Sequence, residues 1–281
     1  MAQTAERTHQ YSAEATVIAG HLVLPFRQEI GRQAHTTLPE EGGYFSRRVE
    51  DFRLGEVISV RSGYTLVAGN RSNKPGEGWS TLTTVVVEGL NVLEVVTADR
   101  IVGQILTDHP PEGNVPTISF LGTRFENLRI EGHPVKLELN LGILGPKPAD
   151  DKPYGLDERF KKDISDQYNL ILESEGLPAD KRERYSRLSA SLGSQEEVEC
   201  SLVKTAKCDF PGPCFGHWFH IPHFGWISLG NVKVGYKEVQ EKGLTLRKTT
   251  VSLTMIDLIL GCAIEGHGVV GGTSTNGQTV P

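Results

Sequence analysis

The densest group of chemically capable side chains in the chain lies in residues 216–226. Neutral imidazole is the commonest metal ligand in proteins, and aromatic planes beside hydrogen-bonding imidazoles suit a sugar or an aromatic ligand. Three interpretations follow: a ligand-binding or active-site wall, a structural metal site, and plain packing with surface histidines. The stretch holds three of the nine histidines and two of the three tryptophans: His217, Trp218, His220, His223 and Trp226.

The spacing of these histidines argues against a shared metal ion. Side chains alternate between the two faces of a regular strand, so His217 and His223 would point one way and His220 the other. Cys208 and Cys214 precede them, but the C-x5-C-x2-H spacing matches no strong zinc pattern. The sequence therefore predicts no metal site and no cofactor.

A second candidate is the adjacent pair Asp99 and Arg100, which follows an apolar stretch at residues 95–98. A carboxylate and a guanidinium where a strand ends could orient a ligand. The alternative is a pair that caps a turn and contacts neighbouring backbone. These patterns identify no catalytic residue, so all seven residues are candidates for ligand binding alone.

Strands must position these residues, because a short β-type phrase recurs along the chain. It occurs at residues 52–60 (FRLGEVISV) and 227–234 (ISLGNVKV), with looser copies at 90–98 and 256–263. Apolar and polar residues alternate with a period of two, which is typical of a strand with one buried face. The glycine suits a bulge or a tight bend. The sequence predicts a mainly β protein, an antiparallel sandwich or barrel.

A longer correspondence links two copies of the phrase. The letters TTV begin at Thr83, seven residues before Leu90, and again at Thr249, seven residues before Ile256. Two interpretations remain open: an internal duplication that produced two related β halves, and chance similarity between β stretches.

The composition changes between the β-rich segments. In residues 156–175 four apolar residues recur at helical spacing, with charged residues opposite: Phe160, Ile164, Tyr168 and Ile171. Gly176 is a natural stop, and Pro178 can open a second helix that ends near Leu192. We therefore expect a β-rich half at 1–148, a helical insertion of two short helices at 149–195, and a β-rich half at 196–281 that packs with the first.

The bulk composition excludes several classes of protein. The net charge is −6, which argues against a nucleic-acid partner, since such a partner requires a basic face. No apolar run approaches the ~20 residues of a membrane span, and residues 1–10 are polar, without a signal-peptide core. We expect a cytoplasmic protein. Its four cysteines are too few for a disulfide framework.

Three strings resemble blocks of uncharacterised bacterial proteins: residues 87–100 (VEGLNVLEVVTADR), 120–132 (FLGTRFENLRIEG) and 224–234 (FGWISLGNVKV). More loosely, residues 97–99 (TAD) and 127–132 (NLRIEG) are similar to repeats of secreted choice-of-anchor-type β domains. The resemblance implies β architecture and bacterial origin. It carries over no catalytic residue.

Two functions are compatible with these patterns. The first is a structural or ligand-binding protein that self-associates through exposed β edges, with a small molecule or sugar as ligand. The second is a cofactor-independent enzyme (a cyclase, isomerase or hydrolase) with a pocket lined by the histidines and tryptophans. An enzyme should bury His217, His220 or His223 in a closed pocket with a displaced pKa. An assembly protein should leave them on a flat surface, with termini that cross into a neighbouring chain.

Overall fold

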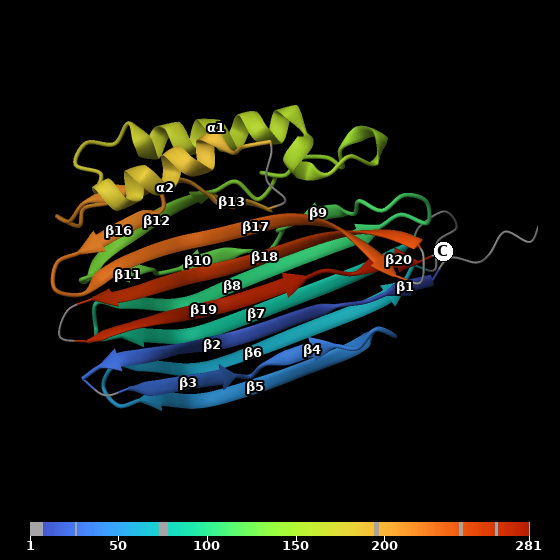
Figure 1. The fold of residues 1–281 in the computed structure, drawn as a ribbon. Coiled ribbons are helices and arrows are strands. Elements are labelled where there is room, and N and C mark those ends of the chain that lie inside the picture. Colours follow the sequence, from blue (N-terminus) through green and yellow to red (C-terminus); the bar gives the residue numbers. More distant parts are fainter. Residues whose placement is uncertain are drawn as a thin grey trace, which may run out of the picture.

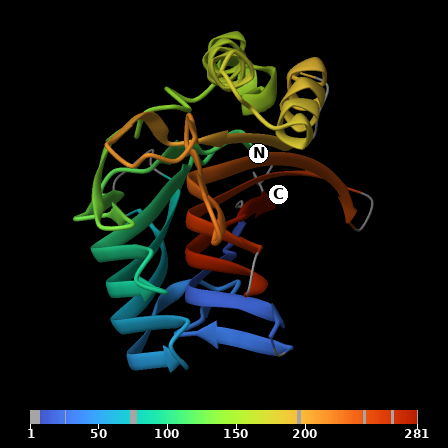
Figure 2. The same ribbon diagram turned by 90° about the vertical axis from the view of Figure 1, so that its left-hand side faces the viewer.

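The computed structural model describes residues 8–25, 27–72, 78–193, 197–241, 244–261 and 264–280. These residues form two nine-stranded antiparallel sheets, which face each other as two layers of a sandwich (Figures 1 and 2). The predicted mainly β, antiparallel architecture with a helical insertion is confirmed.

The first sheet contains β5 (Gly43–Leu54), β6 (Ile58–Arg71), β7 (Trp79–Val92), β8 (Val96–His109), β9 (Thr117–Ser119), β10 (Arg124–Glu126), β11 (Arg129–Ile130), β12 (His133–Leu139) and β14 (Val203–Cys208). Its order is β14-β12-β11-β8-β7-β6-β5, and β9 and β10 also pair with β8. The edge strand β5 therefore lies far from β14.

The second sheet contains β2 (Ala13–Leu24), β3 (Gln28–Gln33), β4 (Thr36–Leu38), β13 (Glu197–Ser201), β15 (Cys214–Phe215), β16 (Trp218–Ile221), β17 (Gly225–Glu241), β18 (Leu244–Gly261) and β19 (Glu265–Thr275). Its order is β15-β16-β17-β18-β19-β2-β3, with β13 beside β17 and β4 beside β2. The sheets do not divide at the helical insertion, because β2–β4 join the C-terminal strands and β14 joins the N-terminal ones.

Two-residue alternation builds the core between the sheets. In β7 and β8 buried residues alternate with half-buried ones over most of each strand, and β18 repeats the pattern between Val251 and Leu260. Side chains from both sheets, among them Val85, Ile101 and Leu253, belong to one buried apolar cluster. The core thus follows the periodicity that the sequence predicts.

The four copies of the β-phrase adopt different local structures. The copies at 52–60 and 90–98 are hairpin turns, between β5 and β6 and between β7 and β8. The other two lie within β17 and at the end of β18, except for residues 262–263, which lie outside the described residues. Gly55 and Gly230 have φ values of 52° and 61°; Gly55 occupies a tight turn, and Gly230 a position where the pairing of β17 with β18 is interrupted without a change of register.

Each sheet also has one row of positions where strand pairing is interrupted. In the first sheet the row is Asp51, Arg61, Gly89 and Asp99. In the second sheet it is Gly230, Met255, Gly271 and Val17. Such interruptions bend the strands and increase their twist.

The helical insertion covers one end of the sandwich. After two short 3₁₀ turns, η1 (Ala149–Asp151) and η2 (Tyr154–Leu156), it forms α1 (Glu158–Leu172) and α2 (Ala179–Ala190). The side chain of Asp157 caps α1 by accepting a hydrogen bond from the backbone of Phe160 at 2.9 Å. The predicted apolar stripe is buried, and the helices lie at the end opposite β3 and β5 (Figures 1 and 2).

The first and last described strands meet. β1 (Thr8–Gln10) pairs with β20 (Gln278–Val280), so the terminal strands hold each other within one chain. In the part of the chain that the structure describes, neither helix has the length and apolar character needed to span a bilayer.

Candidate functional site

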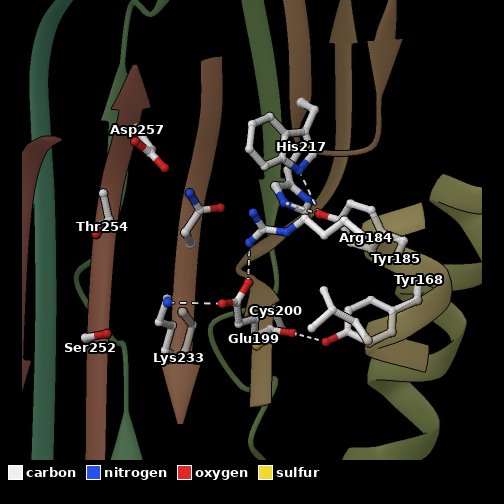
Figure 3. Close-up of a pocket in the computed structure, with 14 residues that line it drawn as sticks. Tyr168, Arg184, Tyr185, Glu199, Cys200, His217, Lys233, Ser252, Thr254 and Asp257 are labelled. Atoms are coloured by element: carbon white, nitrogen blue, oxygen red, sulfur yellow. Dashed lines mark hydrogen bonds and ion pairs between the residues drawn. The ribbon is translucent and has the colours of Figure 1, made fainter. Parts of the chain in front are cut away.

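A cavity of about 240 Å³ lies between the helical insertion and the second sheet (Figure 3). Helices α1 and α2 form one wall, and β13, β17 and β18 form the other. The strand residues in this wall, such as Asn231 and Thr254, alternate with core residues, so they point away from the sandwich interior. The left-handed backbone of Gly230 shifts this alternation, and Ser228 and Asn231 lie close enough for a hydrogen bond of 2.6 Å between their side chains.

Three charged side chains form a chain of ion pairs along the cavity. Glu199 of β13 binds Lys233 of β17 with an Oε1–Nζ distance of 3.0 Å, and its other oxygen binds Arg184 of α2. Burial acts to raise the pKa of Glu199, but the two cations outweigh it and lower that pKa. The pKa of Lys233 is raised. Burial acts to lower it, but the hydrogen bond and the negative charge of Glu199 outweigh burial. All three groups are therefore charged at neutral pH.

The opposite side of the cavity carries a second pair. Asp257 of β18 accepts a hydrogen bond from His267 Nε2 at 2.6 Å, and this bond raises the pKa of His267 although burial opposes it. Ser252 and Thr254 lie on the same strand and also line the cavity (Figure 3). This wall offers a carboxylate and two hydroxyls.

A buried aromatic network closes the cavity near β16. Trp218 Nε1 donates a hydrogen bond to Tyr185 Oη at 2.7 Å, and Tyr185 Oη lies 3.3 Å from His217 Nε2. Since the tyrosine oxygen accepts from Trp218, its own hydrogen can go to Nε2, which places the imidazole hydrogen on Nδ1. That Nδ1 is buried and has no hydrogen-bond partner among the described residues.

His217 is neutral in this position. Burial lowers its pKa to about 3, and the positive charges of Arg184 and Lys181 act in the same direction. The residue lies in the turn between β15 and β16, where Gly216 has a φ of 63°. A second cavity of about 250 Å³, between α1 and Val203, also reaches His217.

Lys181 of α2 lies over two indole rings. Its Nζ is 4.0 Å from the ring centre of Trp218 and 5.1 Å from that of Trp226, which is cation–π geometry. The residue is only 8% exposed, and burial lowers its pKa. Lys181 therefore fastens the start of α2 to the aromatic residues of β16 and β17.

The structure brings four of the seven predicted ligand-binding residues together, and two of these four line the cavity. His217 and Trp218 line the cavity, and Trp226 contacts Trp218 edge to face with ring centres 6.3 Å apart. His220 packs on Trp226 with ring centres 4.6 Å apart, and His223 is exposed in the turn before β17. Neither His220 nor His223 lines the cavity.

Asp99 and Arg100 lie on the first sheet, in β8, and also do not line the cavity. Asp99 accepts a hydrogen bond from Asn127 Nδ2 at 2.6 Å, and Arg100 Nε lies 3.7 Å from Glu88 Oε1. Both side chains thus interact with neighbouring strands and turns.

None of the four charged residues that line the cavity was among the residues predicted from the sequence. Arg184, Glu199, Lys233 and Asp257 come from four different elements, and no spacing in the sequence connects them. The one available signal was on α2, where residues 181, 185 and 188 recur at helical spacing and mark a second buried face.

Metal ligation has no support in the described ranges, where no group of three His, Cys, Asp or Glu side chains is close enough to hold an ion. Cys208 and Cys214, the thiols nearest the histidine stretch in sequence, are free, and burial raises the pKa of Cys214 to about 11. A thiol with that pKa is protonated and a poor ligand at neutral pH.

Comparison with known proteins gives one match. The family model of a domain of unknown function matches residues 9–235, which is most of the chain and includes both helices, β13 and the cavity-lining part of β17. No curated protein and no solved structure matches the chain significantly.

Proposed function

Since the chain belongs to this family, DUF8256, whose function is unknown, we propose a function from the cavity itself: the protein binds a small, uncharged, hydroxyl-rich molecule of about the size of a monosaccharide. The observation that carries the proposal is a cavity wall of ionised groups whose charges already cancel within the protein.

Cavity size limits the ligand. Pockets for drug-sized molecules usually enclose about 300–1,000 Å³, and this cavity of about 240 Å³ is smaller. A single sugar ring or a short polyol is therefore a better match than a nucleotide or a lipid.

Charge balance favours an uncharged ligand. Two cations, Arg184 and Lys233, and two anions, Glu199 and Asp257, line the cavity, so their formal charges sum to zero. Each is already paired, and a charged ligand would have to displace a protein partner. Hydroxyl groups can instead donate to the carboxylates and accept from the cations without breaking these pairs.

Spare hydrogen-bonding capacity supports the same class of ligand. The carboxylates of Glu199 and Asp257 have more lone pairs than their protein partners use. Hydroxyl groups of a bound molecule can donate to these free lone pairs.

The pKa of His217 favours binding over catalysis. A general base works best when its pKa is near the operating pH, and burial holds this pKa at about 3. A neutral, weakly basic imidazole can orient a ligand by hydrogen bonding but removes protons poorly. His217 thus meets the criterion of a buried histidine with a displaced pKa, but the pKa is displaced away from the range that suits a general base, so the enzyme has less support than the binding protein.

Removing one polar group from the cavity is expected to weaken binding of the ligand about tenfold. Thr254→Val keeps the side-chain shape and removes a hydroxyl, and Asp257→Asn removes the charge. The measurement is isothermal titration calorimetry with glucose, galactose, mannose, ribose and inositol, and with zwitterionic glycine and anionic acetate as comparators that carry charged groups. Asp108→Asn, an exposed carboxylate on β8, is the matched control and should bind like the wild type.

Each outcome of this experiment decides the proposal. Binding of a neutral polyol that Thr254→Val and Asp257→Asn weaken, and Asp108→Asn does not, supports it. Selective binding of the charged comparators contradicts the proposed ligand class. Equal affinity in all variants contradicts the location, and no heat of binding from any neutral compound contradicts the function.

We also propose that an internal duplication produced two related β halves, one on each side of the helical insertion. In the alignment that matches Thr83 with Thr249, Gly89 corresponds to Met255, and these residues lie in the interrupted rows of the two sheets. Both lie in central strands, β7 and β18. The cytoplasmic location and the bacterial origin expected from the sequence stay predictions.

A further inference from the structure

The strand β5 is a long, exposed sheet edge. It has 12 residues and, among the described residues, pairs only with β6, along one of its sides. Nine of its residues are exposed, and Tyr44 and Phe45 keep 66% and 42% of their surface in solvent. Unpaired backbone groups along such an edge are a template for another strand. β5 lies at the end of the sandwich opposite the helices (Figure 1).

The charges of β5 are ordered so that the strand complements itself. Residues 47–51 read Arg-Arg-Val-Glu-Asp, two cations and then two anions around a central valine. When two copies of this segment run antiparallel, each cation lies opposite an anion. Opposite charges across a strand pair stabilise it, and like charges destabilise it.

Symmetry restricts the register of such a pair. In a two-fold antiparallel pair, residues directly opposite each other have side chains on the same face of the sheet. The two-fold axis must therefore lie between one residue and the same residue of the other copy. An axis at Arg48 or at Glu50 places a charged residue against its own copy. An axis at Val49 places Arg48 opposite the partner's Glu50 and leaves no like charges opposed.

The charged residues of β5 form only weak ion pairs within one chain, so they can pair with a second copy. Arg48 Nε and Glu50 Oε1 are 2.9 Å apart, but both side chains are more than 60% exposed, and such pairs contribute little in water. Arg47 and Asp51 form no ion pair with any other described residue. An axis at Val49 would also bring Arg47 of one copy toward Asp51 of the partner subunit, the residue where the backbone leaves the extended conformation with a φ of 49°.

We propose that the protein forms a two-fold dimer by antiparallel pairing of β5 with its copy, centred on Val49. The pairing covers residues 47–51, because strand pairing is already interrupted at Asp51. It joins the first sheets of two copies into one continuous sheet. The interface lies at the end opposite the helices that form one wall of the cavity, so it does not depend on the proposed ligand (Figure 1).

Charge reversal tests the interface and its register together. Sedimentation equilibrium of the full chain should give a dimer of two 30.8 kDa subunits. Arg48→Glu and Glu50→Arg should each weaken dimerisation about 100-fold, because each places like charges opposite one another twice. An equimolar mixture of the two variants should form a heterodimer, and the double variant should form a homodimer again.

A matched control separates the interface from general charge effects. Arg124 and Glu126 form the same kind of exposed pair on β10, with a distance of 2.7 Å, so Arg124→Glu should leave the dimer unchanged. A monomeric wild type at all concentrations overturns the proposal. A dimer that survives Arg48→Glu, or a variant mixture that stays monomeric although circular dichroism shows folded protein, overturns the proposed register and strand.

Discussion

Acidification from pH 7 to pH 5 is expected to lower the free energy of unfolding by about 6 kcal/mol. Three buried histidines cause the effect. Burial lowers the pKa of His9 to about 4, and those of His109 and His217 to about 3, from an ordinary value of 6.5. Their exposed fractions are 8%, 2% and 4%, so water screens them little.

The direction follows from proton binding in the two states. Between pH 6.5 and the folded pKa values, the unfolded chain takes up a proton at each histidine and the folded chain does not. Stability is therefore complete above pH 6.5 and falls as the pH falls. At pH 5, about 1.5 pH units below the unfolded pKa, each histidine costs about 2 kcal/mol. His267 acts in the opposite direction, because Asp257 raises its pKa, but its side chain is 43% exposed and its effect is smaller.

Two of these histidines lie together near the paired chain ends. The rings of His9 and His109 are 4.5 Å apart, and His9 also stacks on Trp79 at 5.3 Å. Protonation of one ring disfavours protonation of the other, since like charges repel. We expect acid to loosen the pairing of β1 with β20 before the central strands.

Urea unfolding at pH 7, 6 and 5, followed by tryptophan fluorescence, measures the effect. His109→Gln removes one titrating group and should reduce the pH dependence by about a third. His223→Gln changes an exposed histidine and should leave it as in the wild type. A wild type equally stable at pH 7 and pH 5, or a His109→Gln variant with unchanged pH dependence, contradicts the assignment.

Local patterns in the sequence were enough to predict the sheets and the helices. Alternation in residues 83–105 identifies β7 and β8, and the stripe that begins at Phe160 identifies the buried face of α1. Both patterns arise because burial acts on neighbouring side chains at the period of the backbone. His217 and Trp218 could also be predicted as site residues, because histidines and tryptophans cluster in residues 216–226.

The rest of the cavity depends on pairing between distant strands. Glu199 reaches Lys233 because β13 pairs with β17, and Asp257 joins them because β18 pairs with the other side of β17. Neither pairing is encoded in local spacing, since several registers satisfy the same alternation. The exposure of β5 likewise becomes visible only when the strand order shows that it is an edge. The self-complementary charges of β5 are visible in the sequence, but nothing in the sequence indicates that this strand lies at the edge of a sheet.

Replacing Phe160 by alanine is expected to lower the free energy of unfolding by about 3–5 kcal/mol. The side chain has no solvent-exposed surface and meets Tyr154 edge to face, with ring centres 6.3 Å apart. Phe160 lies in the first turn of α1, directly after the Asp157 cap, so its loss leaves a cavity where the insertion is fastened to the sandwich.

Leu170→Ala on the same helix is the matched control. Leu170 is 57% exposed, so its truncation should change stability by no more than about 0.5 kcal/mol, although both substitutions place alanine in α1. Urea unfolding of the two variants measures the difference. Similar losses in both would show that helix propensity, and not the buried stripe, holds the insertion in place.

The Phe160→Ala variant also connects the insertion to the cavity. Tyr168 of α1 donates a hydrogen bond to the backbone oxygen of Glu199, so a loosened α1 releases the strand that carries the central carboxylate. Hydrogen exchange in the variant should increase in α1 and β13 and stay slow in β7, which lies in the other sheet. Uniformly faster exchange in all three elements would show that the insertion and the sandwich unfold as one unit.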